Sequence, residues 1–190
     1  MPSKKNTNLK KSGIDVYSIL DSKAASVDSS DILVLPHFAG AGTPYMDTGA
    51  KGAISGLNFS TIPIQLYKAS LEGVTFEMLY NLECLSDAGV CINELRAVGG
   101  GAKSNLWLQI KSDILNKKIE TLNVDEAGTL GTAIIAGTAT GIYSSLDEAV
   151  KTLVKVKKEF YPNKEAHEKY MEKYYKYKKM YKAIREIHEG

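Results

Sequence analysis

Residues 94–121 read ELRAV, GGGAKSN, LWLQIKSDILN and KKIET, and this stretch decides the fold. The apolar run that ends at Val98 predicts a strand. Three consecutive glycines then allow positive φ angles and let the backbone lie close against a flat or anionic ligand. Ser104 and Asn105 are cap-type residues, which predict that a helix begins there and offers its free N–H groups to a ligand. The stretch therefore predicts a strand, a glycine turn, a helix and a second strand. The expected buried stripe of the helix is Leu106, Trp107, Ile110, Ile114 and Leu115.

A single glycine-rich turn is more often an ordinary connection than a binding site, so its context decides. A P-loop is excluded, because its Lys follows a Gly whereas Lys103 follows Ala102. A dinucleotide fingerprint fits in part, since Gly99 and Gly101 stand at the expected positions. Glu120 lies about where such a fingerprint places the acid that binds ribose. An NAD-binding Rossmann domain is therefore one alternative.

Length and composition indicate one globular domain. The chain has 190 residues, of which 44% are hydrophobic and 24% charged. No apolar run is long enough to cross a bilayer, and the N-terminus has no secretory hydrophobic region. Cys84 and Cys91 are too few to staple a chain of this length. We therefore expect a cytoplasmic protein, without membrane association.

The C-terminal part is basic, with 12 Lys or Arg against 6 Asp or Glu in residues 151–190. Interleaved aromatic and basic residues could bind single-stranded nucleic acid, as in a non-catalytic binding module. Packing is the favoured interpretation, because the aromatic residues recur at helical spacing with their hydroxyls expected at a solvated rim. The stripe is Tyr170, Tyr174, Tyr177, Tyr181 and Ile184. The three histidines are too dispersed to suggest a metal site.

The preceding chain predicts short strands and long helices. Residues 32–35 and 52–57 read as strands on either side of a loop rich in glycine and proline. A helix follows from about Thr61 to Gly89, and Glu72 within it is expected to be structural. Its expected core face is Ile64, Tyr67, Leu71, Val74, Met78 and Leu82. Residues 127–141 predict a second helix, buried, whose small residues recur every four positions.

Three stretches of this chain resemble the sequence motifs of one family. Residues 52–72 read GAISGLNFSTIPIQLYKASLE, and residues 99–113 read GGGAKSNLWLQIKSD. Residues 125–133, DEAGTLGTA, follow at a short distance. The first resembles the second signature of the FGGY carbohydrate kinases, and the other two resemble that family's adenosine motif, in its xylulokinase-like form, and the helix after it. The resemblance extends from about Asp31 to the C-terminus.

The resemblance implies an α/β domain with the RNase H-like fold of the actin and sugar kinase ATPase superfamily, a mixed sheet flanked by helices. Family members have two such domains, and the N-terminal one carries the first phosphate loop, the metal-associated acid and the catalytic aspartate. None of these is recognisable here. We therefore expect a C-terminal kinase half, either excised or separately encoded. Residues 1–30 would be a polar remnant of the preceding part, residues 31–162 the nucleotide-binding domain, and residues 163–190 a helix packed on it.

For the site, the resemblance implies that ATP donates its γ-phosphoryl group to a sugar or polyol hydroxyl, with Mg²⁺ held by the missing N-terminal domain. The expected nucleotide-binding residues are Gly99, Gly100, Gly101, Ala102, Ser104, Asn105 and Ser60. No catalytic or metal-binding residue is expected in this chain. The expected partners are ATP or ADP, the sugar or polyol and the N-terminal kinase domain. A homodimer is possible, and nucleic acid is not expected.

Overall fold

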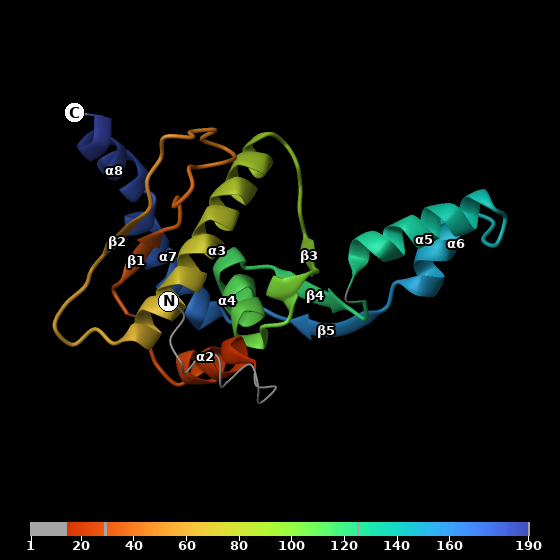
Figure 1. Ribbon diagram of the computed structural model, residues 1–190, viewed down its shortest axis with the longest axis horizontal. Helices are drawn as coiled ribbons and strands as arrows, with labels where there is room; N and C mark the ends of the chain where they lie inside the picture. The colour runs from red at the N-terminus through yellow and green to blue at the C-terminus, as the bar shows by residue number, and fades with distance from the viewer. Residues whose placement is uncertain (1–14, 29, 125, 190) are drawn as a thin grey trace, which may run out of the picture.

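Helix α3, Pro63–Asp87, is the axis around which the other elements are placed (Figure 1). The computed structural model describes residues 15–28, 30–124 and 126–189. Pro63 stands in the first turn of α3, where its missing N–H costs nothing. The helix ends before Gly89, whose φ of +85° turns the chain away. The predicted helix from Thr61 to Gly89 is confirmed.

The strands form two small sheets. Strands β1 (Leu33–Leu35) and β2 (Ala53–Ser55) pair antiparallel. Strand β3 (Glu94–Ala97) pairs parallel with β4 (Lys118–Leu122), and β5 (Val156–Phe160) pairs antiparallel with β4. The second sheet is therefore mixed, as predicted, with the order β3-β4-β5.

Helices pack against both sheets, and two of them project from the body. Helix α4 (Asn105–Leu115) connects β3 to β4 and packs against α3. Helices α5 (Ala127–Ala139) and α6 (Leu146–Leu153) pack on each other and form an arm that extends away from the rest of the molecule (Figure 1). Residues 163–190, predicted as one helix, contain two, because the chain breaks at Lys178. The remaining α-helices are α2 (Val16–Ala25), α7 (Lys164–Tyr177) and α8 (Met180–Glu189).

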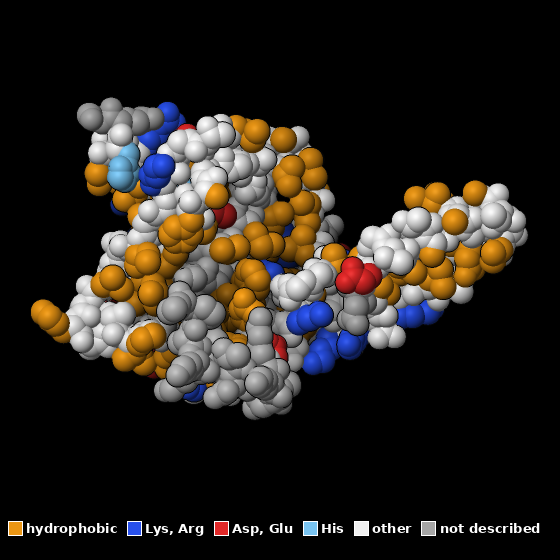
Figure 2. All heavy atoms as spheres, viewed as in Figure 1, with side chains coloured by type: hydrophobic (Ala, Val, Ile, Leu, Met, Phe, Trp, Pro, Cys, Tyr) orange, Lys and Arg blue, Asp and Glu red, His pale blue; other side chains and the backbone are white. Residues whose placement is uncertain are grey.

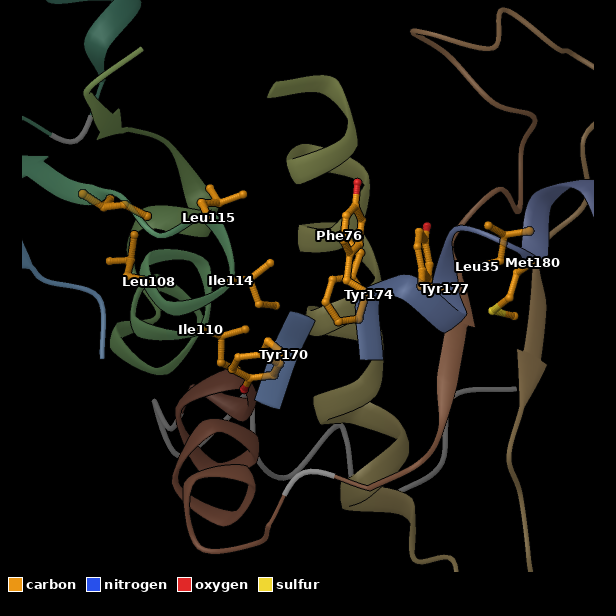
Figure 3. Close-up of a cluster of buried hydrophobic side chains, with 11 residues drawn as sticks. Leu35, Phe76, Leu108, Ile110, Ile114, Leu115, Tyr170, Tyr174, Tyr177 and Met180 are labelled. Carbon is orange, nitrogen blue, oxygen red and sulfur yellow. The ribbon is translucent and has the colours of Figure 1, made fainter. Parts of the chain in front are cut away.

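The tyrosine stripe of α7 belongs to the core, as predicted (Figure 3). The ring of Phe76 on α3 lies 5.2 Å from that of Tyr177 and 5.7 Å from that of Tyr174. The prediction that the tyrosine hydroxyls reach solvent is wrong for Tyr174 and Tyr177, because both hydroxyls donate to carboxylates of α3. Tyr174 donates to Glu83 at 2.8 Å, and Tyr177 donates to Glu77. Each ring thus packs in the core while its polar end has a partner, which fixes α7 on α3.

The predicted core face of α3 is wrong in part. Val74 and Met78 are 37% and 36% exposed, whereas Gly73 and Phe76 are buried. The reason is that α3 meets β1 through Gly73 and α7 through Phe76, on a different side from the predicted stripe. Helical periodicity identifies apolar stripes, but it does not say which stripe a neighbouring element covers.

Helix α5 also differs from its prediction as a buried helix. Only Ile134 and Gly137 of this helix are buried. A Cβ atom added at Gly137 would lie 2.9 Å from the Tyr143 ring, so the small residue is needed for the turn that leads towards α6. The other small residues of α5 are not buried by any element that the structure describes. Among the described residues, no helix combines the length and the hydropathy that a bilayer crossing requires.

Glu72 is a buried structural residue, as expected. It is 1% exposed and forms an ion pair with Lys173 of α7. Lys173 also donates to the carbonyl oxygen of Ser30 at 2.7 Å. A buried carboxylate must be paired to be tolerated, so this contact links α7, α3 and the segment before β1.

Gly73→Ala is predicted to destabilise the chain, because its Cβ atom would lie 2.1 Å from the Val34 carbonyl oxygen, which belongs to the backbone of β1. Overpacking of this kind lowers the free energy of unfolding by about 1–3 kcal/mol. Urea unfolding followed by far-UV circular dichroism measures this loss. Gly131→Ala is the matched helical control, since a Cβ atom there meets nothing within 4 Å. Equal midpoints for the two variants would contradict the close contact at Gly73.

Lys173→Met is predicted to lower the free energy of unfolding by about 3–5 kcal/mol, because it leaves a buried carboxylate without its cation. The control is Lys169→Met, which removes an exposed ion pair with Glu165 on the same helix. Its unfolding midpoint should match that of the unaltered chain. The same urea titration compares both, and a similar loss in both variants would refute the structural role of the Glu72 pair.

Candidate functional site

The glycine turn leaves β3 with a sharp change of direction. Gly99 has a φ of +76°, a conformation that other residues rarely adopt. Residues Gly100–Ala102 then form one turn of 3₁₀-helix, in which the Ala102 N–H donates to the Gly99 carbonyl at 3.1 Å. The turn exposes main chain rather than side chains between the end of β3 and the start of α4.

Helix α4 begins at the predicted residue. The Ser104 hydroxyl oxygen accepts the Trp107 N–H at 3.0 Å, so Ser104 is the N-cap. The first-turn amides and the positive end of the helix dipole point back towards the glycine turn. Lys158 of β5 donates to the Asn105 carboxamide oxygen at 3.2 Å. The helix start thus combines hydrogen-bond donors with a nearby cation, which suits a polar or anionic ligand.

A large open cavity of about 990 Å³ lies beside this turn, between α2, α3 and α4. The glycine turn and the start of α4 form one wall, and α2 forms the opposite one. Tyr67 of α3 contributes an aromatic side, and its hydroxyl donates to Asp21 of α2 at 2.8 Å. Burial and this hydrogen bond raise the pKa of Tyr67, so the hydroxyl stays neutral. Residues that line the cavity include Tyr67, Leu71, Gly100, Gly101, Ser104, Asn105 and Trp107.

Two glycines in the turn have different surroundings. A Cβ atom added at Gly100 meets nothing within 4 Å, so the backbone there borders open space. A Cβ atom at Gly101 would lie 3.1 Å from the Trp107 ring. A side chain at Gly101 would therefore crowd the Trp107 ring, whereas Gly100 leaves a bare backbone surface that a flat ring could contact.

Trp107 links the turn to α3. Its indole N–H is 3.0 Å from the Thr75 hydroxyl oxygen and 3.2 Å from the Leu71 carbonyl oxygen. The Lys111 ammonium lies 3.7 Å from the centre of the Trp107 ring. Burial lowers the pKa of Lys111. These contacts fix the Trp107 ring, so the wall of the cavity is preformed.

A smaller cavity of about 290 Å³ lies on the other side of the turn. It sits where the parallel strands β3 and β4 end, the edge at which ligands bind in open α/β sheets. Three lysine side chains border it. Residues that line it include Gly99, Ala102, Lys103, Asn105, Lys157 and Lys158. The turn is thus accessible from two sides, one aromatic and one basic.

The structure brings six of the seven predicted site residues together. Gly100, Gly101 and Ser104 line the large cavity, and Asn105 lines both. Gly99 and Ala102 line the small cavity. Ser60 lines neither, and its hydroxyl donates to Asn58 at 2.7 Å within the loop before α3. The contact of these residues with nucleotide stays a prediction.

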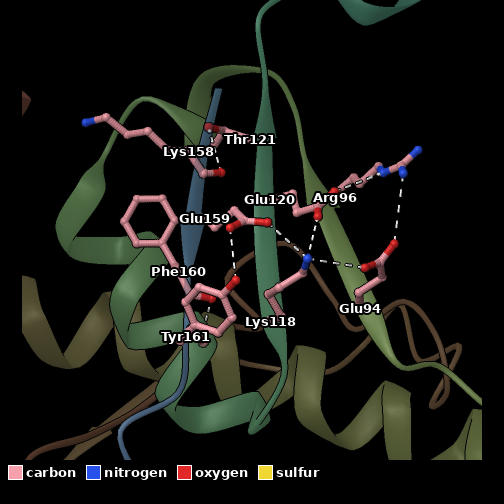
Figure 4. Close-up of polar contacts among 10 residues, drawn as sticks. Glu94, Arg96, Lys118, Glu120, Thr121, Lys158, Glu159, Phe160 and Tyr161 are labelled. Carbon is pink, nitrogen blue, oxygen red and sulfur yellow. Dashed lines mark hydrogen bonds and ion pairs between the residues drawn. The ribbon is translucent and has the colours of Figure 1, made fainter. Parts of the chain in front are cut away.

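Glu120 does not have the placement that a ribose-binding acid requires. It lies in the middle of β4, opposite Arg96 in the register with β3. Its carboxylate pairs with Lys118 at 2.6 Å and with Arg96 at 3.4 Å (Figure 4). Hydrogen bonds to Glu120 and Glu159 raise the pKa of Lys118, so this network is charged. Glu120 therefore serves the sheet, which argues against the Rossmann alternative.

The sequence reasoning missed the contributions of α2 and α3 to the cavity. The sequence pattern places Tyr67 and Leu71 on a core face, and it makes the segment that contains Asp21 a polar remnant of the preceding part, whereas all three line the cavity. These residues are far from the glycine turn in the sequence, and no local pattern connects them to it. Within the described ranges, no group of three or more His, Cys, Asp or Glu side chains could hold a metal ion.

Curated relatives of this chain are kinases of small sugars and polyols. It is 31% identical over 170 residues to xylulose kinase from Staphylococcus epidermidis, covering 89% of this chain and 34% of the relative. It is 36% identical over 152 residues to glycerol kinase from Saccharolobus islandicus, covering 79% of this chain and 30% of the relative. The chain thus spans about a third of the length of the relatives it matches.

Solved structures agree with these matches. Xylulose kinase from Rhodospirillum rubrum superimposes with a TM-score of 0.78 at 26% identity, covering 90% of this chain and 34% of that one. Plasmodium falciparum glycerol kinase with ADP superimposes with a TM-score of 0.76 at 28% identity, covering 91% of this chain and 35% of that one. The expected RNase H-like fold of the actin and sugar kinase ATPases is thereby confirmed. Residues 5–140 match the FGGY family of carbohydrate kinases, C-terminal domain. The chain therefore belongs to the FGGY family of carbohydrate kinases.

Proposed function

We propose that this chain is the nucleotide-binding part of an ATP-dependent kinase that phosphorylates a hydroxyl group of a small sugar or polyol. The observation that carries the proposal is the bare backbone at Gly100, which borders the large cavity next to the capped start of α4. The glycerol kinase that this chain resembles in structure was solved with ADP, which supports a nucleoside diphosphate as the ligand. Both xylulose and glycerol kinases are relatives, so the proposal names the substrate class only.

The arrangement fits an adenine nucleoside in its shape and chemistry. A flat base would lie against the backbone of Gly100, with the aromatic side of the cavity formed by Tyr67 and Trp107. Ser104 and Asn105 would offer polar contacts to the base or the ribose. The dipole of α4 favours negative charge at the same end of the helix. ATP would supply the phosphoryl group, while these residues bind and orient it.

The remaining chemistry is proposed to belong to the part of the kinase that this chain does not span. An acid that takes the proton of the sugar hydroxyl, the main sugar contacts and a site for Mg²⁺ are expected in an N-terminal domain. The described residues hold no cluster suited to a metal ion, so no step through Mg²⁺ is assigned to them. Closure of the two domains would exclude water from the transferring phosphoryl group.

Gly100→Val is predicted to weaken ADP binding at least tenfold, because the new side chain would occupy the space above the turn. ADP should bind the unaltered chain with a millimolar-scale dissociation constant, about 4 kcal/mol, since only the nucleoside side of the site is present. Calorimetric titration with ADP measures the dissociation constant of each protein. The control is Gly42→Val, at another glycine whose Cβ atom would meet nothing within 4 Å. Equal affinities for all three proteins would place the nucleotide elsewhere, and tighter binding of NADH would revive the Rossmann alternative.

The chain on its own is predicted not to phosphorylate xylulose or glycerol. The physical reason is that proton removal and phosphoryl charge neutralisation both need groups that this chain is not expected to contain. Incubation with radiolabelled ATP and Mg²⁺, followed by separation of sugar phosphates, tests it. Full-length xylulose kinase from Staphylococcus epidermidis is the positive control. Turnover by the pure chain would refute the assignment of the chemistry to another domain.

A further inference from the structure

The small cavity lies on the opposite side of the glycine turn from the large one. Its volume of about 290 Å³ is at the low end of the range that ligand pockets occupy, about 300–1,000 Å³. Ala97 and Thr121, at the ends of β3 and β4, contribute to its wall, and the glycine turn and β5 border it. This size suits a phosphate group with a short carbon skeleton rather than a whole nucleotide.

A β-bulge in β5 places two consecutive lysines at this cavity. The register shifts between Thr121 and Leu122 of β4, which leaves Lys157 as an extra residue of β5 without a partner in the ladder. In a regular strand the side chains of Lys157 and Lys158 would point to opposite faces of the sheet. Both nevertheless line the cavity. Bulges are frequent beside binding sites, because they redirect a side chain in this way.

The bulge also separates Lys157 from the acidic side chains of the sheet. In a regular strand, Lys157 and Glu159 would lie on the same face. That face carries the ion-pair network in which Lys118 pairs with Glu159 and Glu120. Figure 4 shows the side chain of Lys158 pointing away from this network. The bulge therefore brings a second ammonium group to the cavity instead of adding it to the paired charges of the sheet.

The positive charge of the cavity is not neutralised by the described residues. Lys103, Lys157 and Lys158 line it, and the described residues that do so include no Asp or Glu. Lys158 donates to the neutral carboxamide of Asn105 at 3.2 Å. Glu126, at the base of the arm, is exposed and does not line the cavity. Figure 2 shows Lys and Arg side chains gathered where the arm joins the body. A concave site lined by one sign of charge attracts ions of the other sign.

We infer that this cavity binds the phosphate group of a small molecule, held by Lys103, Lys157 and Lys158. Ammonium groups donate strong, charge-assisted hydrogen bonds to phosphate oxygens. A bound phosphate also offsets the repulsion between like charges that border one small space. The positive end of the α4 dipole lies at the same edge and favours the same ligand. The ligand is either inorganic phosphate or a phosphate monoester with a short carbon chain.

The inference does not depend on the proposed nucleotide site. Lys157 and Lys158 do not line the large cavity, whereas Lys103 and Asn105 border both. A phosphate in the small cavity would therefore be a neighbour of the nucleotide rather than a part of it. The competing occupant is the diphosphate of the nucleotide itself, reaching over the turn from the large cavity.

The test titrates inorganic phosphate into the unaltered chain and follows the amide resonances by nuclear magnetic resonance. Saturable shifts are expected at residues 99–105 and 156–158, with affinity that falls as sodium chloride is added, because salt screens the charges. The cavity variant, Lys157→Gln with Lys158→Gln, should bind phosphate at least tenfold more weakly. Lys157→Arg with Lys158→Arg keeps both charges and should retain binding.

Lys164→Gln with Lys179→Gln is the matched control, because it removes the same charge from two exposed lysines that line neither cavity. It should bind phosphate as the unaltered chain does. Circular dichroism checks that all variants are folded. Equal weakening in the control and the cavity variant, or shifts spread over the whole surface, would show non-specific attraction only and overturn the inference.

ADP distinguishes the two occupants. The cavity variant should bind ADP within twofold of the unaltered chain, and saturating ADP should leave phosphate bound. Displacement of phosphate by ADP, together with weaker ADP binding by the cavity variant, would assign the lysines to the nucleotide and overturn the inference. Phosphate binding without any ADP binding would refute the nucleotide site alone.

Glycerol 3-phosphate and xylulose 5-phosphate distinguish the sources of the phosphate group. Tighter binding of either compound than of inorganic phosphate supports an organic phosphate as the ligand, whereas equal or weaker binding supports inorganic phosphate. Glycerol and xylulose themselves should leave the resonances around the cavity unshifted. Shifts there of the same size without a phosphate group would overturn the inference.

Discussion

The contact between Trp107 and α3 is the interaction on which the candidate site depends. The indole N–H reaches the carbonyl oxygen of Leu71 and the hydroxyl of Thr75, so the start of α4 is held against the middle of α3. Gly101 lies beside the ring, and a Cβ atom there would lie only 3.1 Å from it, closer than an ordinary van der Waals contact. The glycine turn therefore has one position relative to α3, and the cavity beside it has a fixed aromatic wall.

The rest of the core holds α3 in place from the other side. Phe76 packs among the tyrosines of α7, and Glu72 pairs with Lys173. These contacts combine rings in the core with hydroxyl and ammonium groups whose partners are carboxylates of α3. Rings packed in the core provide the hydrophobic free energy, while the paired polar groups fix the orientation of the two helices. The C-terminal segment is therefore part of the support of the site rather than a basic tail.

Part of the sheet edge and of the apolar helix surface is uncovered among the described residues. The mixed sheet ends at β3, and apolar side chains of α3 and α5 have no covering layer among the described residues. The same chain spans about a third of its kinase relatives. An uncovered apolar surface and an open strand edge both disfavour a solitary domain, because each creates a site for association. These features support the proposal that the chain is one part of a larger enzyme.

The sequence by itself determined the local elements of the site. Three glycines after a strand and cap-type residues before an apolar helix were enough to predict the turn, the helix start at Ser104 and Asn105 and a strand on either side of them, because these depend on backbone freedom and short-range hydrogen bonds. Tertiary structure alone decided which side of each helix is covered. Val74 is exposed and Tyr67 lines a cavity, although both fall on one predicted core face. Helical periodicity shows only that one stripe of a helix is apolar. Whether that stripe is buried depends on an element from a distant part of the chain, which the local pattern does not identify.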